Sequence, residues 1–395
     1  MKNSSQNEKK IRLMNLLFVA VIMLVLFAGL IQTAFFPDDI TDLENRYANK
    51  ISPLTAAGYM DGSYQSDMEA ALGDQVTLST IYKRLYHEGR SYILHRLCEP
   101  LLRTEHFSER YFSLNSVLVF GGENLVYFPY PDSRKTELDA RIEDLNKTFA
   151  AFPQQDFCLY YIERDVDINF ETGEKRDFYG YISERLQLPQ EKMSCFSVNS
   201  FEEYSRLFFK TDHHWNHVGS YLGYCRVLEL LGCGDEPLSP TGTLMLSDSY
   251  SGSKAVSCAA SFSEDFYVYS FSFPPMDILI NGLPAADYGS TESGPRANYP
   301  RVYGDDCGEI VFSTSRPEKE DLLIIGESFD NAILKLLASH YDSTRSVDLR
   351  YYEAYTGKSF VLSEYLAEHP ADKVLLIGNI DYYLLPDFML LRQGE

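Results

Sequence analysis

Short apolar runs alternate with helical patterns along most of this chain. Runs rich in β-branched and aromatic residues are predicted to be strands: SVLVF at 116, NLVYF at 124, DFCLYYI at 156, DILIN at 277, EIVFS at 309, DLLIIG at 321 and KVLLIG at 373. Helical spacing of apolar residues occurs between several of them, in residues 134–151, 216–231, 330–341 and 361–367. This alternation predicts an α/β domain with a mainly parallel sheet flanked by helices.

The rest of the chain is organised around this domain. Residues 37–100 are interpreted as a connector and a helical neck, because residues 37–62 are polar and contain Pro and Gly, whereas residues 65–100 show helical spacing. We expect the α/β domain over residues 101–395. Within it, about residues 235–308 are rich in Gly, Ser, Pro and Tyr and have few helical periods, so an inserted β-rich region is predicted there.

One uncharged segment is long enough to cross a membrane. From Leu13 to Phe36 the sequence contains 24 residues without a charge, which as a helix span about 36 Å. Basic residues dominate residues 1–12, and acidic residues dominate the positions just after 37. We therefore predict a cytoplasmic tail over residues 1–12, a single-pass transmembrane anchor in the lipid bilayer over residues 13–36, and an extracytoplasmic carboxyl-terminal domain at the cell membrane. A cleaved signal peptide is the alternative, but the run exceeds a usual signal core and no small-x-small site follows it.

Charge and cysteine usage exclude some classes of function. Acidic residues outnumber basic ones by 57 to 35, which gives a net charge of −22. Such a chain repels phosphate backbones, so we expect no nucleic-acid partner. The seven cysteines include no CxxC pair and no metal-finger spacing, which excludes a zinc ribbon. Most of them lie in apolar runs, so buried thiols are favoured, and one or two disulfides remain an alternative.

A histidine cluster is the first candidate for chemistry. Three of the eight histidines and the only Trp lie between Lys210 and His217, in the sequence KTDHHWNH. A carboxylate next to an imidazole orients the ring and stabilises its protonated form, so His214 with Asp212 is a candidate general base. Asp212 could instead cap the helix that follows. A metal site is a third interpretation, since His214 and His217 lie one helical turn apart, with Asp212 or His213 to complete it.

A Ser at a predicted strand-to-helix turn is the second candidate. In GESFDN at 326–331, Ser328 follows the strand DLLIIG and precedes the helical pattern AILKLLASHY. Such a Ser lies at the carboxyl edge of a parallel sheet, where the first helical N–H groups can stabilise an oxyanion. An ordinary helix cap is the alternative. A nucleophilic Ser needs a base with an orienting carboxylate, and outside this cluster no His has an Asp two or three residues before it, which leaves His214 with Asp212.

These motifs occur together with others in a recognisable order. TDHHW at 211–215, YSGS at 250–253, GESF at 326–329 and VDLRYY at 347–352 follow LENRYANKISP and MDGSYQSDMEAALGDQ near the uncharged segment. The chain thereby resembles the DHHW family of anchored bacterial surface proteins, related to the SGNH-like O-acetyltransferases that modify alginate and other exopolysaccharides. The resemblance implies an SGNH-hydrolase-like fold in which Ser328 is the nucleophile, His214 the base and Asp212 the orienting acid. It also implies that Trp215 shapes the substrate pocket and that His213 is a non-catalytic spacer.

The chain departs from the esterase pattern of this superfamily at several points. The GDSL block is GESF here, the Asp-x-x-His near the carboxyl terminus is absent, and the Gly and Asn of the esterase oxyanion hole cannot be located. The second oxyanion donor is therefore open. Asn331 is a candidate substrate-binding donor, Arg350 either lines the site or forms a structural ion pair, and Asn379 is interpreted as a turn residue.

Together these features predict a membrane-anchored extracytoplasmic O-acyltransferase. It would move an acetyl group through an acyl-serine to a polysaccharide or cell-wall glycan, with no cofactor and no metal. CoA is a cytosolic acetyl donor and is not available to a domain outside the cytoplasm. The resemblance therefore implies that a membrane-bound acyl exporter is a partner. The alternatives are a carbohydrate esterase with the same triad and a non-catalytic glycan-binding or cell-wall-binding protein of the same fold.

The topology can be tested on intact cells. If residues 13–36 anchor the chain, added protease should digest the region after residue 37 and leave an amino-terminal tag intact, because the basic flank keeps the tail in the cytoplasm. Immunoblots against the tag and against the region of Ser328 measure both outcomes. A Ser328 region that resists protease until the cells are lysed would contradict the prediction.

Overall fold

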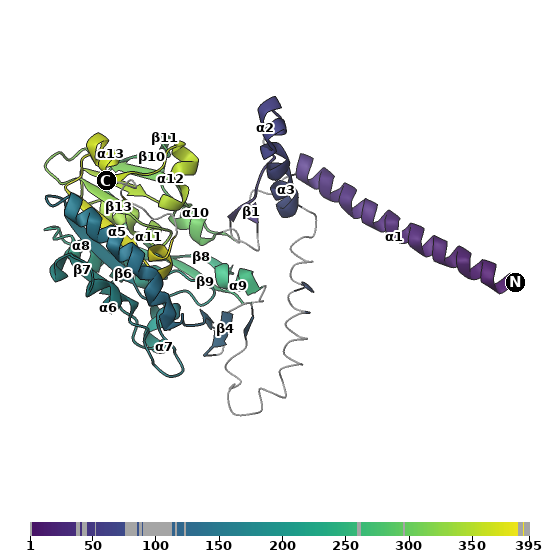
Figure 1. Cartoon of the computed structure of the whole chain (residues 1–395), viewed down its shortest axis with the longest axis horizontal. Helices are drawn as coiled ribbons and strands as arrows, with labels where there is room; N and C mark the ends of the chain where they lie inside the picture. The colour runs from purple at the N-terminus through teal and green to yellow at the C-terminus, as the bar shows by residue number, and fades with distance from the viewer. Residues whose placement is uncertain are drawn as a thin grey trace. The chain divides into compact units, whose positions relative to one another are not determined.

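The computed structural model describes the chain except residues 1, 37–39, 42–45, 52, 76–84, 87–88, 90–112, 115–116, 122–123, 259–261, 295–296, 386–389 and 391–395. The chain divides into two compact units, whose helices and strands are labelled in Figure 1. The first comprises Met1–Thr104 and Val256–Ala260, and the second comprises Glu105–Ala255 and Ser261–Glu395. Most of the predicted neck beyond residue 75 lies outside the described residues, and the domain boundaries drawn from the sequence stay predictions.

The described part of the first unit is mostly helical. Its elements are α1 (Lys2–Phe35), α2 (Ala56–Asp61), α3 (Ser63–Gln75) and the short antiparallel pair β1 (Ile40–Thr41) and β2 (Arg46–Tyr47). Helix α2 begins where the Thr55 hydroxyl accepts a hydrogen bond from the N–H of Gly58, and it ends at Gly62, whose φ of 87° favours glycine. The predicted anchor of residues 13–36 lies within α1 up to Phe35. Measured over the described residues, no helix reaches the length and hydropathy that crossing a bilayer requires.

An eight-stranded sheet forms the centre of the second unit. Its strands are β6 (Asp156–Ile162), β7 (Met193–Phe196), β10 (Asp277–Ile280), β11 (Leu283–Ala285), β12 (Glu309–Ser313), β13 (Leu322–Ile325), β14 (Ser343–Val347) and β15 (Lys373–Gly378). Their order is β11-β10-β12-β14-β13-β15-β6-β7. The five strands from β14 to β7 are parallel, whereas β12, β10 and β11 extend the sheet with antiparallel pairing. The predicted α/β class is confirmed, with an antiparallel extension on one side.

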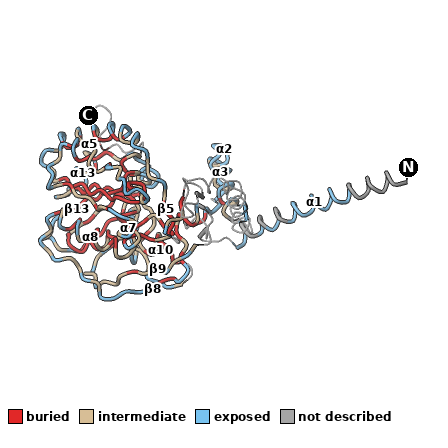
Figure 2. The backbone as a smooth tube through the Cα atoms, turned by 90° about the horizontal axis from the view of Figure 1, so that it is seen from below, coloured by how far each residue is buried: buried red, intermediate tan, exposed pale blue. Residues whose placement is uncertain are grey.

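Helices cover this sheet on both faces. Helices α8 (His217–Leu230) and α11 (Asn331–Ala338) pack on one face, and α5 (Asp139–Ala151), α6 (Phe178–Ser183) and α13 (Leu362–Glu368) pack on the other. Successive strand residues point to opposite faces, so Tyr160 belongs to the first core and Tyr161 to the second. In Figure 2 the strands of this sheet are coloured mainly as buried, as expected for a sheet covered on both faces.

Smaller elements complete the second unit. A separate sheet is formed by β3 (Ser113–Leu114), β4 (Val117–Phe120) and β5 (Asn124–Tyr127), and β8 (Gly242–Tyr250) pairs with β9 (Glu264–Ser270) inside the predicted insertion. The short helices of this unit are α7 (Phe201–Leu207), α10 (Tyr299–Tyr303), α12 (Leu349–Thr356) and α14 (Ile380–Tyr383). Helix α9 (Ser253–Cys258) begins in this unit, and its residues from Val256 on belong to the first unit. The predicted strands at 116 and 124 thus correspond to β4 and β5, which belong to the small sheet rather than to the central one.

The sequence patterns miss three strands of the central sheet. Strands β7 and β11 are only four and three residues long, and β14 has the polar sequence STRSV. Strand β14 lies between β12 and β13, and this position buries Thr344 and Ser346 although their composition is typical of loops. These residues are buried by the neighbouring strands, and they do not form an apolar run in the sequence. A search for apolar runs therefore does not find β14.

The topology brings three distant segments to one edge of the sheet. Strands β13, β15 and β6 are parallel neighbours, so their carboxyl ends lie together. The residues that follow these strands are 326–328, 379–381 and 163–165, in that order. Because sites of open α/β sheets form outside the carboxyl ends of the strands, this edge is where the candidate site is expected.

Candidate active site

Ser328 lies in the turn between β13 and α11 and is partly exposed. The turn is tight because residue 326 has no side chain: a Cβ there would lie 2.1 Å from Oδ2 of Asp330 and 2.9 Å from Cγ2 of Ile377. The Tyr299 hydroxyl donates to the carbonyl oxygen of Ser328 over 3.0 Å. The turn therefore holds the Ser328 backbone at the carboxyl edge of the sheet.

His214 lies in the loop between α7 and α8. Trp215, the next residue, is fully buried in the core, and its β-bridge to Phe208 ties the loop to the end of α7. Asn216 caps α8, because its side chain accepts hydrogen bonds from two backbone N–H groups of the first turn. The alternative in which Asp212 caps this helix is therefore wrong, and the Asp212 carboxylate is available for His214.

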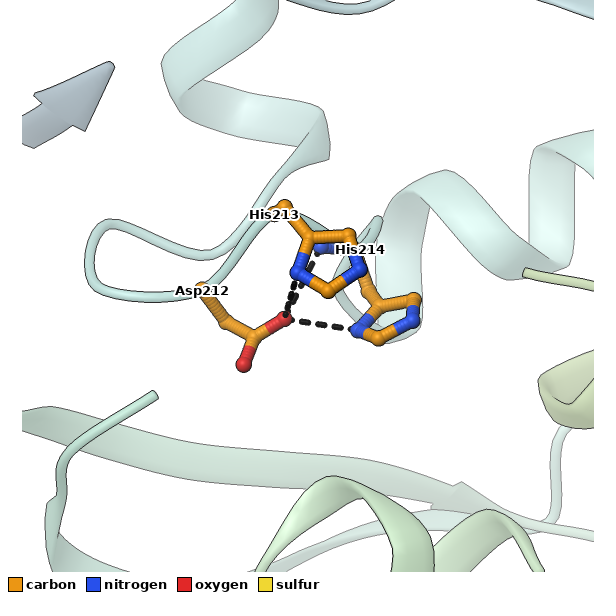
Figure 3. Close-up of side chains that lie close together, drawn as sticks. All are labelled: Asp212, His213 and His214. Carbon is orange, nitrogen blue, oxygen red and sulfur yellow. Dashed lines mark hydrogen bonds and ion pairs between the residues drawn. The ribbon is translucent and has the colours of Figure 1, made fainter. Parts of the chain in front are cut away.

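Hydrogen bonds connect Asp212, His214 and Ser328 in a continuous chain. Nδ1 of His214 lies 2.6 Å from Oδ1 of Asp212, and Nε2 lies 2.9 Å from Oγ of Ser328. An ionised carboxylate can only accept, so Nδ1 carries the proton and Nε2 can accept the proton of the Ser328 hydroxyl. Figure 3 shows Nδ1 of His214 directed at the carboxylate. The structure thus brings together the three residues that the sequence singled out.

The Asp212 carboxylate is buried, with 1% of the residue exposed. Burial alone raises the pKa of a carboxyl group, but the attraction of His214 and the hydrogen bonds to Asp212 hold its pKa well below the usual range. Oδ1 also accepts from the N–H of His214 over 3.0 Å, and Oδ2 accepts from the Tyr250 hydroxyl over 2.8 Å and from the N–H of Ser253 over 2.7 Å. Asp212 therefore stays ionised and keeps a fixed orientation.

The YSGS segment at 250–253 packs directly on Asp212. A Cβ at position 252 would lie 2.4 Å from Cβ of Asp212, so only glycine fits there. The next residue, Lys254, is fully buried, with Nζ 2.6 Å from the Asp165 carboxylate and a hydrogen bond of 2.7 Å to the Tyr204 hydroxyl. A buried ion pair thus holds the segment that donates to Asp212. The resemblance includes YSGS, but the sequence assigns it no role.

Two aromatic rings pack against the His214 imidazole. The Tyr299 ring is stacked on it, with centroids 3.7 Å apart and an interplanar angle of 5°, and the Phe329 ring lies 4.9 Å away. Tyr299 also bonds the carbonyl of Ser328, so one side chain contacts both the base and the nucleophile turn. Sequence reasoning misses Tyr299, because it lies in the irregular segment NYPRVY, which shows no pattern that points to His214.

His213 lies beside the hydrogen-bonded chain. Its Nδ1 is 2.6 Å from Oγ of Ser253, and burial together with the neighbouring His214 lowers the pKa of His213 well below the usual range, so the ring is neutral at pH 7. Ligand atoms of Asp212, His213 and His214 lie within 4.8 Å of one another and could hold a metal ion. His217, the other predicted ligand, instead packs against two tyrosines of β9.

A second group of potential metal ligands lies apart from this site. Ligand atoms of Cys233, Asp235 and His340 also fall within 4.8 Å of one another. The ammonium of Lys319 lies 2.8 Å from both carboxylate oxygens of Asp235, so a cation already neutralises this carboxylate. The group therefore forms an ion pair in the structure.

Two residues predicted to contact substrate are placed differently. Trp215 is fully buried and packs against the Phe329 ring, so it supports the His214 loop from the core and does not line an open pocket. Asn331 accepts a hydrogen bond of 3.0 Å from the Tyr288 hydroxyl and donates over 3.3 Å to the carbonyl of Gly304. Among the described residues Asn331 forms no hydrogen bond with His214 or with Ser328. Sequence alone does not show that the Trp215 side chain faces the core.

Arg350 and Asn379 both interact with the side chain of Glu327, the residue before Ser328. Arg350 pairs with Asp348 over 2.6 Å and with Asp306 over 3.4 Å, which matches the structural ion pair that the sequence left open. Burial raises the pKa of Glu327 to about 7, an effect that Arg350 opposes. Both the backbone N–H and the side-chain amide of Asn379 donate to Glu327. Asn379 therefore ties the end of β15 to the Ser328 turn.

The packing on Asp212 leads to a prediction. Gly252→Ala should displace the Asp212 carboxylate, because the added Cβ overlaps its side chain. We expect the free energy of unfolding in urea to fall by about 1–3 kcal/mol and the labelling of Ser328 by a fluorophosphonate to slow. Gly234→Ala is the matched control, since a Cβ at position 234 meets no atom within 4 Å. Equal stability and equal labelling of the two variants would refute the packing argument.

Comparisons with known proteins find similarity only at the level of structure. No family model matches the sequence, and no curated protein matches it. A DHHW family protein from Eubacterium siraeum has a TM-score of 0.53 at 14% identity, over 70% of this chain and 95% of that chain. PatB1 from Bacillus cereus has a TM-score of 0.53 at 18% identity, over 71% of this chain and 99% of that chain. As the sequence resemblance implies, this chain shares its fold with solved DHHW-family and PatB1 structures.

Proposed function

We propose that this protein is an O-acyltransferase that carries an acetyl group on Ser328 and passes it to a hydroxyl group of a cell-surface or exported glycan. The observation that carries the proposal is the chain from Asp212 through His214 to Ser328, with distances of 2.6 and 2.9 Å. The fold shared with PatB1 supports it, and one PatB1 structure carries a sulfonyl adduct.

In the first half-reaction, Oγ of Ser328 attacks the carbonyl carbon of the acetyl donor while its proton moves to Nε2 of His214. Asp212 stabilises the imidazolium that forms, because its carboxylate is ionised and hydrogen-bonded to Nδ1. The bond to the leaving group then breaks, and the leaving group takes the proton from Nε2. The products are an acetyl ester on Ser328 and a neutral His214.

The negative charge that develops on the carbonyl oxygen needs hydrogen-bond donors. The backbone N–H of Ser328 has no hydrogen-bond acceptor in the part of the chain that the structure describes. Helix α11 begins three residues later, so the positive end of its dipole adds to the stabilisation. The Ser328 N–H is thus the proposed first donor, and the side chain of Asn331, which bonds Tyr288 and Gly304, is not assigned as the second.

In the second half-reaction, the hydroxyl group of a sugar gives its proton to His214 and attacks the acetyl carbonyl carbon. The bond from Oγ of Ser328 to the acetyl group breaks, and Oγ takes the proton back from Nε2. Water in place of the sugar would make the same triad an esterase. The two activities differ only in which acceptor reaches Ser328, so an acceptor-dependent assay separates them.

We also propose that residues 13–36 anchor the protein in the cell membrane with the catalytic unit outside the cytoplasm. The support is the uncharged run of 24 residues with a basic flank on its amino side. Outside the cytoplasm CoA is absent, so a membrane-bound acyl exporter would supply the acetyl group. This partner follows from the proposed location and from the resemblance.

The acyl-enzyme can be detected directly. Purified full-length protein incubated with p-nitrophenyl acetate should release a burst of p-nitrophenol and gain the mass of one acetyl group on the peptide that contains Ser328, because acylation precedes deacylation. Ser328→Ala should abolish both signals. If the folded wild-type protein shows neither signal but binds a wall polysaccharide, the non-catalytic alternative replaces the proposal.

The two neighbouring histidines should respond differently to substitution. His214→Ala should slow the burst roughly a thousandfold or more, because the base is lost, whereas His213→Ala should cost much less, because His213 bonds Ser253 and not Ser328. Circular dichroism checks that both variants fold. An equal loss in both, with metal recovered in the purified protein and activity removed by a chelator, would favour the metal site instead.

A further inference from the structure

A pocket opens beside His213, the neighbour of the proposed base His214. It has a volume of about 580 Å³ and is lined by Tyr127, Phe128, Tyr130, Arg164, His213 and Asp381, with two prolines. This volume lies within the range of about 300–1,000 Å³ that is typical of small-molecule sites. His213 connects the pocket to the proposed active site, because the ring centroids of His213 and His214 are 3.8 Å apart.

The pocket and the nucleophile occupy the same edge of the central sheet. Arg164 follows β6, Asp381 follows β15, and Ser328 follows β13, and these three strands are successive parallel neighbours. From β6 the chain continues to β7 on one side, and from β13 it continues to β14 on the other side. Ligands of open α/β sheets bind where the connections diverge in this way.

One wall of the pocket is aromatic. Phe128 is 43% exposed, which is high for a large apolar side chain, and it lies between Tyr127 and Tyr130 in sequence and in the pocket lining. The Tyr130 hydroxyl donates to Oδ1 of Asp381 over 2.7 Å, which fixes the position of this ring. The apolar C–H face of a sugar ring packs on such rings, whose polar groups are turned to one side.

The charged groups at the pocket cancel one another. Arg164 pairs with Asp165 over 3.0 Å and hydrogen-bonds Asp381, and Asp165 pairs with Lys254 over 2.6 Å. Two positive and two negative charges sum to zero, so among the described residues that line the pocket no cation is left over for an anionic ligand. The chain as a whole carries −22, which would repel a polyuronate further.

The polar groups suit a ligand that carries hydroxyl groups. Asp381 is 41% exposed at its side chain and keeps lone pairs that can accept from a hydroxyl. Nε2 of His213, whose side chain is 28% exposed, forms no hydrogen bond with any described residue. Donors and acceptors without a net charge match an uncharged sugar.

We propose that this pocket is the acceptor subsite and that it binds an uncharged pyranose ring of the glycan in preference to a uronate. The inference rests on the proposed acyl transfer, since the bound ring must present a hydroxyl to the acetyl group on Ser328. That hydroxyl forms the new ester bond as the bond to Oγ of Ser328 breaks, and its proton returns to Oγ through His214. The ring would stack on Phe128 and hydrogen-bond Asp381.

A matched pair of acceptors tests the proposal. Full-length protein is acetylated with p-nitrophenyl acetate, and either a β-1,4-linked glucose tetramer or the same tetramer oxidised to glucuronate at every ring is added. Mass spectrometry measures the ratio of acetylated tetramer to free acetate, which separates transfer from hydrolysis. We expect the ratio to be at least tenfold higher with the glucose tetramer.

Variants identify the pocket as the source of this preference. Phe128→Ala should lower the transfer ratio for the glucose tetramer about tenfold, whereas Tyr355→Ala, an exposed tyrosine of α12 that does not line the pocket, should leave it unchanged. Asp381→Asn leaves one surplus positive charge, so it should reduce the preference for glucose over glucuronate at least threefold.

The possible failures point to different errors. Absence of the acetyl burst in wild-type protein would refute the acyltransferase, and the subsite with it. If the burst is normal, four results would overturn the neutral-sugar subsite and leave the acyl-serine intact. These are equal transfer to both tetramers, a preference for the glucuronate tetramer, transfer to neither tetramer, and no effect of Phe128→Ala.

Discussion

The candidate site depends on one buried carboxylate, that of Asp212. Taking an ionised carboxylate out of water is costly unless hydrogen bonds and a partner with positive character replace the water. Here its donors come from His214, two residues further along the chain, and from Tyr250 and Ser253 in the predicted insertion. The histidine loop and the insertion must therefore fold together, because either one alone would leave the charge of Asp212 without its donors.

The predicted insertion is for this reason part of the candidate site. It supplies Tyr250 and Ser253 to Asp212, and its α10 supplies Tyr299, which stacks on His214 and bonds the backbone of Ser328. Buried Lys254 fastens the same segment to Asp165, which follows β6 in the central sheet. The sheet therefore positions His214 through the predicted insertion as well as through its own loops, and Asp165 connects this support to Arg164 of the proposed acceptor pocket.

Several features of the fold and the site were predictable because they are local in sequence. The apolar runs indicated most strands of the sheet, since a strand covered by helices on both faces needs apolar residues along its length. Ser328 was predictable from a strand, a glycine and a helix in succession, and His214 from an Asp two residues before it. Strand β14 was not predictable, because its residues are mostly polar and form no apolar run. Thr344 and Ser346 are buried only because β14 lies between β12 and β13.

The sequence by itself thus determined the α/β class and singled out Ser328, His214 and Asp212 as the candidate site, because each of these has a signature within about ten residues. Only the tertiary structure decided that Trp215 packs into the core, that Gly252 must lack a side chain beside Asp212, and that Tyr299 stacks on His214. It also decided that His214 meets Ser328, which lies 114 positions further along the chain. Such contacts arise from the order of strands in the sheet, and no local periodicity records that order.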